Sequence, residues 1–514
     1  MNSHTRRTAA FGAVAAALAL AAPATAAEPG KGRGLDRYYQ QRIDWGSCAK
    51  GPGDSMGRDL DKAGVRCADV TVPLDYAEPE GRTIRVAISR LEATDRRHRV
   101  GALLINPGGP GGTALDMPPD IRKAMKETGA RYDLIGMDPR FVGRSTPLDC
   151  GWPVSTTVLS AGADRAGFER QVALQKGLAD KCRATAAEAL PHVSTRNTAR
   201  DMDVIRGALG ERKLSYLGYS YGTYLGTVYT QMFPGRYDRM VLDGALDTAR
   251  YQPRLLKGAE RENERALADW AAWAARRHTT YGLGRSRAQV LAAVDRIVDR
   301  SARGGLTLGT GRDAFRVDES HVPFLLVEGI ADDTDTARAA FGETVSALAE
   351  AAAGRPVRLP PHLTELLRYA TTGVESAFGS SQTAILCGDV AAPRDPESYW
   401  RDIQRSRTRH PLFGPLTGNV TPCAFWDRPR ERPTRVRHDA RALIVAATGD
   451  PRAPYEGSVA LRHRLPAAKL ITLKGANRHG LYGEYGNACV DDHVNAYLAT
   501  GELPAKDRTC LRQP

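Results

Sequence analysis

The sequence of 514 residues lacks the common signatures of metal and nucleotide enzymes. It contains no H-E-x-x-H motif and no C-x-x-C motif, which argues against zinc and dithiol redox sites. Its glycine-rich run at residues 106–112 has neither the G-x-G-x-x-G spacing nor a following Lys-Ser/Thr pair, which argues against a nucleotide loop. No low-complexity tract indicates disorder, since 42% hydrophobic and 25% charged residues is a globular composition. We therefore expect no metal and no cofactor.

The apolar run near the N-terminus, residues 9–22, is too short to cross a membrane. It follows Arg6 and Arg7 and precedes a small-residue A-T-A motif, which is the order of a secretory signal peptide. We predict a signal peptide over residues 1–26, a leader or pro-segment over 27–40, no membrane span, and a secreted, extracellular protein.

The eight cysteines are an even number, which indicates disulfides in an exported protein. Sequence alone does not fix their pairing, but they fall in four groups of sequence neighbours. We expect each cysteine to bond to its neighbour: Cys48 to Cys67, Cys150 to Cys182, Cys387 to Cys423, and Cys489 to Cys510.

The formal charge is +13, or +11 once Arg6 and Arg7 leave with the signal peptide. Arginines are scattered through the chain, as in the segment D-R-P-R-E-R-P-T-R-V-R-H at 427–438, and acids are interleaved with them almost everywhere. This pattern argues against nucleic-acid binding and is typical of a solvated surface. We keep weak association with an anionic cell wall as a hypothesis about binding partners.

Strand-like and helix-like patterns alternate along most of the chain. Apolar segments typical of strands occur at 83–93, 101–106, 132–137, 214–219, 238–243, 441–447 and 468–474, with helical patterns between several of them. Such alternation predicts a mostly parallel sheet with helices on both faces. Residues 250 to 405 carry helical patterns almost alone. We predict an α/β core in two parts, 41–250 and 406–514, interrupted by a helical lid over 251–405.

A G-x-S-x-G motif surrounds Ser220, after one predicted strand and before one predicted helix. In this context the motif is a nucleophile elbow, a turn so sharp that larger residues than Gly218 and Gly222 would collide with the neighbouring backbone. The turn would hold the Ser220 hydroxyl above the sheet edge, at the N-terminus of a helix. We predict Ser220 as a catalytic nucleophile.

A serine nucleophile needs a base and an acid, which follow it along the chain in this kind of site. Asp450 and His479 each follow a predicted buried strand. We predict His479 as the base and Asp450 as the acid, and we keep Asp243 and Asp247 as weaker alternatives for the acid because they follow the strand at 238–243. For the oxyanion hole we expect the amides of Tyr221 and Gly109, the latter in the glycine-rich run.

These motifs together resemble those of the secreted tripeptidyl aminopeptidases of actinomycetes and related proline-iminopeptidase-like serine peptidases. The resemblance is carried by N-P-G-G-P-G-G at 106–112, G-Y-S-Y-G-T-Y-L-G at 218–226, A-I-L-C-G-D at 384–389, G-D-P-R-A-P-Y-E-G at 449–457 and R-H-G at 478–480. It implies an α/β-hydrolase fold with a helical lid, the roles already given to Ser220, Asp450 and His479, and peptide substrates with free N-termini. Pro107 stands where prolyl iminopeptidases have histidine, so strict proline specificity is not implied.

The leading hypothesis is therefore an extracellular serine exopeptidase that releases short peptides, tripeptides above all. An exopeptidase needs a carboxylate for the substrate ammonium, and Glu328 and Asp389 are the candidates. A carboxylic-ester hydrolase or acyltransferase with the same three residues is the alternative, and a non-catalytic wall-associated protein is a third.

Overall fold

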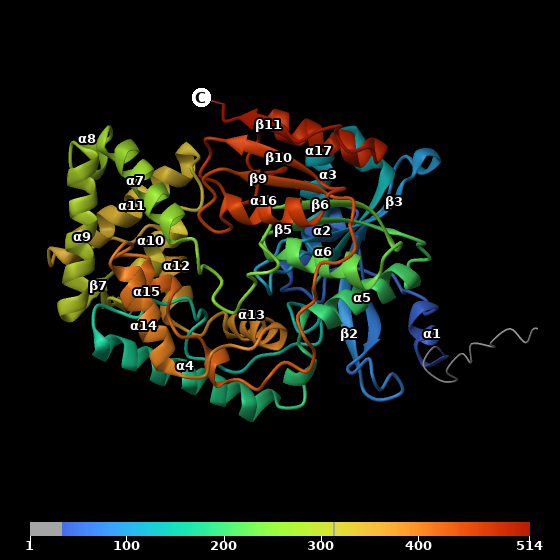
Figure 1. The fold of residues 1–514 in the computed structure, drawn as a ribbon, viewed down its shortest axis with the longest axis horizontal. Coiled ribbons are helices and arrows are strands. Elements are labelled where there is room, and N and C mark those ends of the chain that lie inside the picture. Colours follow the sequence, from blue (N-terminus) through green and yellow to red (C-terminus); the bar gives the residue numbers. More distant parts are fainter. Residues whose placement is uncertain (1–32, 312–313, 514) are drawn as a thin grey trace, which may run out of the picture.

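The centre of the molecule is a nine-stranded sheet, seen in a computed structural model that describes residues 33–311 and 314–513 (Figure 1). The strand order is β1-β2-β4-β3-β5-β6-β9-β10-β11. Strand β2 runs antiparallel to β1 and β4, and the other neighbouring strands are parallel. The strands are β1 (Arg66–Pro73), β2 (Thr83–Leu91), β3 (Gly101–Asn106), β4 (Tyr132–Met137), β5 (Leu214–Tyr219), β6 (Tyr237–Asp243), β9 (Leu443–Ala447), β10 (Lys469–Lys474) and β11 (Arg508–Leu511). The predicted signal peptide and residues 27–32 lie outside the described residues.

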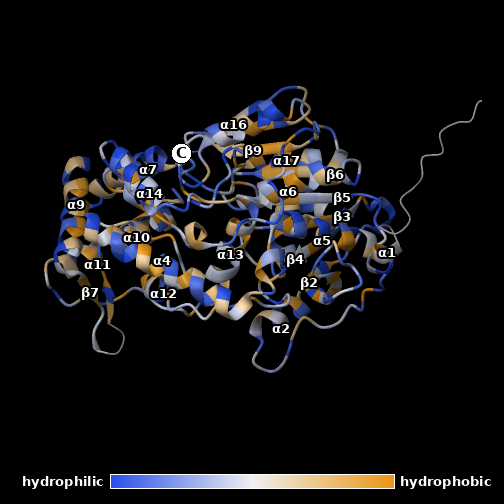
Figure 2. Cartoon of the chain, turned by 60° about the horizontal axis from the view of Figure 1, so that its bottom comes forward, coloured by the Kyte–Doolittle hydropathy of each residue, from blue (hydrophilic) through white to orange (hydrophobic). Residues whose placement is uncertain are grey.

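Helices cover both faces of this sheet. They are α1 (Arg33–Tyr39), α2 (Ser55–Lys62), α3 (Pro118–Met125), α5 (Thr195–Ala208), α6 (Tyr221–Met232), α16 (Tyr455–Arg464) and α17 (Ala488–Thr500). In β3, Leu103 and Ile105 pack in one apolar cluster with α3 and α17, whereas Ala102 and Leu104 pack in the other with α5, α6 and α16. A strand covered on both faces needs apolar residues at every position. The predicted α/β-hydrolase fold is confirmed, and Figure 2 shows the apolar strands enclosed by helices with mixed hydropathy.

A mainly helical unit with its own apolar core lies beside the sheet (Figure 1). Its elements are α7 (Glu260–Ala275), α8 (His278–Tyr281), α9 (Arg287–Gly304), β7 (Leu306–Leu308), β8 (Phe315–Val317), α10 (Val322–Gly329), α11 (Asp335–Ala352), α12 (Pro361–Thr371) and α15 (Gly414–Thr417). In the same stretch of chain, α13 (Ser376–Asp389) packs its apolar residues in the cluster of the sheet, and α14 (Pro396–Arg407) packs its own in a smaller cluster. Most of these elements fall in the predicted lid, whose boundaries stay a prediction. Of the helices that the structure describes, none combines the length and apolar character that a membrane crossing needs.

The long helix α4 (Arg165–Ala186) joins the two units, which the sequence patterns did not show. At one end Phe168 packs with Tyr399 and Ile403 of α14. At the other end Leu178 and Cys182 belong to the apolar cluster of the sheet. The helical unit is therefore fastened to the sheet by a helix from the first part of the chain.

Four disulfides cross-link the chain. They join Cys48 to Cys67, Cys150 to Cys182, Cys387 to Cys423, and Cys489 to Cys510, and no cysteine is free. These are the sequence-neighbour pairs that we expected.

Candidate active site

Ser220 lies in the sharp turn between β5 and α6. Its backbone has φ 54° and ψ −124°, a conformation that residues other than glycine rarely adopt. Such strain is characteristic of a nucleophile elbow. The turn is fixed by the Ser220 amide, which donates to the Asp243 carbonyl at 2.8 Å, and by the Thr223 hydroxyl, which donates to the Ser220 carbonyl at 2.6 Å.

The two glycines of the motif are required by close backbone contacts. A Cβ atom on Gly218 would lie 2.6 Å from the carbonyl oxygen of Gly222, and one on Gly222 would lie 2.8 Å from the carbonyl oxygen of Asn106. Both distances are shorter than Cβ atoms tolerate, so the tight turn depends on glycine at both positions, as the motif predicts.

His479 and Asp450 are in direct contact. Nδ1 of His479 lies 2.8 Å and 3.0 Å from the two carboxylate oxygens of Asp450. The Asp450 side chain is only 2% exposed and its Oδ1 also accepts hydrogen bonds from the amides of Arg452 and Ala453, at 2.8 and 2.9 Å. A buried carboxylate against Nδ1 favours the tautomer with its proton on that nitrogen, which leaves Nε2 as the basic atom.

The imidazole lies beside the elbow. Gly244 follows the residue that holds the Ser220 amide, and a Cβ atom on Gly244 would be 3.2 Å from Cε1 of His479. On the other side, a Cβ atom on Gly480 would be 3.8 Å from the Tyr219 ring. Within the described residues no hydrogen bond joins Ser220 Oγ to the imidazole, and this hydroxyl does not cap α6. In enzymes without substrate this contact is often long and tightens in the complex.

Asp243, the alternative acid, lies close by but contacts a different part of the histidine loop. Its Oδ2 accepts hydrogen bonds from the amides of Leu481 and Tyr482, at 2.9 and 2.7 Å, and burial raises its pKa to about 6. It therefore supports the backbone after His479, while Asp450 holds the ring itself. Asp247 lies farther out, with a carboxylate oxygen 3.7 Å from Nε of Arg464.

The glycine-rich loop packs directly on the elbow. A Cβ atom on Gly108 would lie 3.0 Å from the Tyr221 amide nitrogen and 2.4 Å from the Tyr219 carbonyl oxygen. Gly109, the predicted donor, follows with φ +107°. The Tyr221 amide is the first of α6, a position whose N–H has no partner within its own helix. The closest approach comes from Gly108, a residue that the sequence motifs did not indicate.

The two carboxylates proposed for substrate binding have different surroundings. Glu328, at the end of α10, is 35% exposed and contacts Arg452 at 2.8 Å, two residues from Asp450. Asp389 is buried at the end of α13. It accepts from the Thr195 amide at 2.7 Å, the Thr195 hydroxyl at 2.5 Å and the Tyr251 hydroxyl at 3.0 Å. Burial raises the pKa of Asp389 to about 7.

A short acidic segment of the helical unit, Ala331 to Asp333, holds the histidine loop in place, and the sequence did not predict this contact. The Ala331 carbonyl accepts from the His479 amide at 3.1 Å, and Asp333 accepts from the Asn477 amide at 2.9 Å. Asp332 forms an ion pair with Arg478. The acidic run A-D-D-T-D was the signal, but only the fold shows that it faces the R-H-G motif.

Comparison with known proteins places the chain among peptidases and esterases of one fold. A model described as TAP-like protein matches residues 410–510, and a model of the alpha/beta hydrolase fold matches 101–319. A tripeptidyl aminopeptidase from Streptomyces lividans is 35% identical over 502 residues, which cover 92% of this chain and 87% of the relative. The chain belongs to the tripeptidyl aminopeptidase-like (TAP-like) α/β hydrolases.

Other relatives of this TAP-like serine hydrolase bear different names. The serine protease Hip1 of Mycobacterium tuberculosis is 30% identical over 94% of this chain and 93% of its own length. A carboxylesterase B from the same species is 31% identical over 97% of this chain and 96% of its own. The TAP-like family thus fixes the fold and the hydrolase class, and leaves the bond that is cleaved to the details of the site.

Proposed function

We propose that this chain is an exported serine exopeptidase that releases short peptides, tripeptides above all, from free N-termini. The observation that carries the proposal is the 2.8 Å contact between His479 and the buried Asp450 beside the strained elbow of Ser220. The name of the Streptomyces relative supports the choice of a tripeptidyl peptidase. The four disulfides support export, because they form in oxidising compartments.

In this mechanism Ser220 Oγ attacks the carbonyl carbon of the scissile bond while Nε2 of His479 takes its proton. Asp450 stabilises the imidazolium that forms and keeps the ring oriented. His479 then gives the proton to the leaving amine, and an acyl-enzyme remains on Ser220. Water, deprotonated by His479, attacks this ester, releases the peptide and restores the hydroxyl.

The amides of Tyr221 and Gly109 would stabilise the negative charge on the tetrahedral intermediate. The Tyr221 amide opens α6, whose dipole favours an anion at this end. Gly109 belongs to the loop that Gly108 packs against the elbow, which would bring a second N–H to the same oxygen. Removing one such donor typically costs about 10²–10³-fold in kcat.

For the substrate ammonium we favour Glu328. It is partly exposed, its carboxylate pairs with Arg452, and it lies three residues before Ala331, which contacts the His479 backbone. Asp389, by contrast, already accepts three hydrogen bonds from Thr195 and Tyr251 and is almost completely enclosed. We expect Asp389 to act on substrate binding only through the side chains that it holds.

The surface next to the proposed site is polar, which also favours a peptide. A cavity of about 540 Å³ is lined by Arg452 and Ala453, which follow Asp450 in the chain, but by none of Ser220, Asp450 and His479. Its lining has many charged side chains, including Arg250, Arg254, Lys257, Glu260 and Glu262. An ester hydrolase for long apolar acyl chains would need an apolar lining. The carboxylesterase alternative, which one relative's name supports, would then be confined to small or polar esters.

Two experiments test the proposal. A fluorophosphonate probe should label Ser220, identified by mass spectrometry of the tryptic peptide, and Ser220→Ala should abolish both labelling and hydrolysis. A panel of tripeptide anilides and short-chain acyl esters should then show higher kcat/KM for the anilides. Labelling of another serine contradicts the mechanism, and a preference for esters contradicts the peptidase assignment.

The role of Glu328 has its own test. Glu328→Gln should lower kcat/KM for peptides with a free N-terminus by about tenfold or more, because a charge-assisted contact is lost. Rates on the corresponding N-acetylated peptides should stay within about twofold. Equal losses on both kinds of substrate would show that Glu328 acts through its ion pair with Arg452 instead.

A further inference from the structure

A basic groove lies along the irregular segment of residues 431–438, which we call the strap. The groove has a volume of about 1270 Å³, and none of Ser220, Asp450 and His479 lines it. Its other walls come from α1, the first turns of α5, the end of α6 and the loop after β6. The groove is therefore separate from the proposed peptidase site.

The lining of the groove is strongly unbalanced in charge. It contains six arginines and one acidic residue, Glu431; the arginines are Arg196, Arg200, Arg432, Arg435, Arg437 and Arg464. Six positive charges against one negative charge leave a formal excess of +5. A surface of this charge attracts polyanions over distances of about a Debye length.

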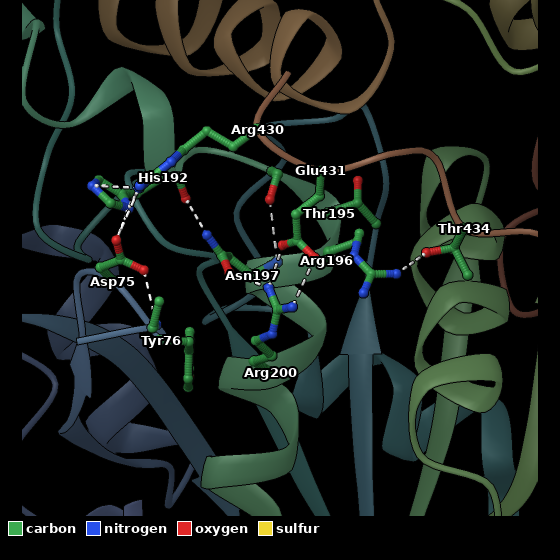
Figure 3. Close-up of polar contacts among 12 residues, drawn as sticks. Asp75, Tyr76, His192, Thr195, Arg196, Asn197, Arg200, Arg430, Glu431 and Thr434 are labelled. Atoms are coloured by element: carbon green, nitrogen blue, oxygen red, sulfur yellow. Dashed lines mark hydrogen bonds and ion pairs between the residues drawn. The ribbon is translucent and has the colours of Figure 1, made fainter. Parts of the chain in front are cut away.

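The only acid of the lining is fully engaged with α5, as Figure 3 shows. Glu431 accepts hydrogen bonds from Arg196 at 2.6 Å and from Arg200 at 2.6 and 2.9 Å. These two guanidinium groups lower the pKa of Glu431 to about 2. The charge of Glu431 is thus paired with the two arginines of α5, and not with the arginines of the strap.

The strap is held in place by contacts that do not involve the side chains of Arg432, Arg435 and Arg437. Arg196 donates to the Thr434 hydroxyl at 2.8 Å (Figure 3). The amides of Arg437 and His438 both donate to Oε1 of Gln231 at 2.7 Å, and the Gln231 amide group donates back to the His438 carbonyl at 2.8 Å. These contacts fix the strap backbone as one wall of the groove.

The side chains of three strap arginines have no acidic partner within the described residues. Arg432, Arg435 and Arg437 are exposed, and none of them forms an ion pair with any acid in residues 33–311 and 314–513. The strap has no regular secondary structure. In an extended chain the Cα atoms of Arg432 and Arg435 are at most about 10 Å apart, and those of Arg435 and Arg437 at most about 7 Å apart. All three arginines line the groove.

The aromatic rings of the groove already lie against arginines, which makes stacking with nucleic-acid bases less favourable. Arg200 lies 5.8 Å from the centre of the Tyr76 ring, and Arg236 lies 5.9 Å from that of Tyr39 and 5.6 Å from that of Phe233. Single-stranded nucleic acids are bound by stacking of bases on open aromatic faces. A peptide is also disfavoured, because Gln231 already occupies the strap amides of Arg437 and His438.

We propose that the strap groove binds a linear polyol phosphodiester, a polymer with one phosphate per short uncharged repeat and no bases. Each strap guanidinium would donate a pair of N–H groups to two oxygens of one phosphate, a geometry for which arginine is suited. Binding would hold the exported enzyme on an anionic polymer while its peptidase site stays open.

The test uses the full exported chain and fluorescein-labelled poly(glycerol phosphate), with affinity measured by fluorescence anisotropy. The variant R432Q/R435Q/R437Q should bind at least tenfold more weakly than wild type. The matched control R285Q/R287Q/R303Q removes the same charge from exposed arginines at the start and end of α9 and should bind within twofold of wild type. Because three phosphates are contacted, wild-type affinity should fall by about 20-fold between about 50 and about 200 mM salt, and this dependence should weaken in the strap variant.

Thermal unfolding and hydrolysis of a tripeptide anilide verify that both triple variants are folded, and the single variant Arg435→Gln provides a milder change if either is not. Equal weakening by the strap and control variants would overturn the proposal, since net charge alone would then explain binding. Oligo-dT or poly-glutamate bound as tightly, with the same dependence on the strap arginines, would overturn the assignment to a polyol phosphodiester.

Discussion

Asp389→Asn should change how the stability of the protein depends on pH. The Asp389 carboxyl is buried where lid and core meet and its pKa is raised from 3.8 to about 7, chiefly by desolvation. In the unfolded chain the carboxyl titrates at its ordinary value, so folding favours its protonated form. The stability that this form contributes is fully present below pH about 4 and is lost as the pH rises to about 7.

The magnitude follows from the size of the shift. About three pKa units at 1.36 kcal/mol each correspond to a loss of up to ~4 kcal/mol in wild type between pH about 4 and about 8. The substituted asparagine cannot ionise, and its amide can replace the carboxylate because the Thr195 and Tyr251 hydroxyls can turn to accept from it. We therefore expect the variant to gain on wild type by up to ~4 kcal/mol over this range.

The assay is urea unfolding of both proteins at several pH values from 4 to 8, with the folded fraction at each urea concentration determined by pulse proteolysis. Glu365→Gln, a change at an exposed carboxylate of α12, is the control and should run parallel to wild type. Parallel curves for wild type and Asp389→Asn would refute the reasoning, because they would mean that Asp389 keeps its charge at no cost in the folded state.

Two further predictions concern the site itself. Asp450→Asn should lower kcat by about 10⁴-fold because the imidazole loses its orienting carboxylate. Asp243→Asn should lower kcat by about tenfold or less, since its side-chain oxygen can still accept from the Leu481 and Tyr482 amides. Both values are measured on a tripeptide anilide, and the reverse order would show that Asp243 is the acid. Gly108→Ala should lower kcat by about a hundredfold or more, because the added Cβ atom would push the elbow away from the loop. The control Gly210→Ala is also at positive φ but in open space, so it should change stability alone. Similar kcat values for the two variants would contradict the close packing of the loop on the elbow.

The sequence was sufficient for the fold class because strands such as β3 and β9 are buried on both faces and therefore appear as continuous apolar runs. The sequence also predicted that Ser220, Asp450 and His479 follow strands whose ends meet at the same edge of the sheet, and their catalytic roles stay a prediction. The sequence did not predict the contacts between the helical unit and the sheet. Nothing local in α4 shows that Phe168 packs on α14, and nothing in A-D-D-T-D shows that it holds the histidine loop, because both depend on how lid and core are placed. The role of Gly108 required the three-dimensional distance to Tyr221.

The most direct test of the exopeptidase proposal is the ratio of kcat/KM for a tripeptide anilide with a free N-terminus to that for its N-acetylated form. Acetylation removes the charge-assisted contact between the substrate ammonium and the carboxylate of Glu328, which costs roughly 1.5–3 kcal/mol. At 1.36 kcal/mol per decade, the free peptide should be cleaved about tenfold to a hundredfold more efficiently. Equal kcat/KM for the two substrates would contradict the proposal and favour an esterase or an endopeptidase.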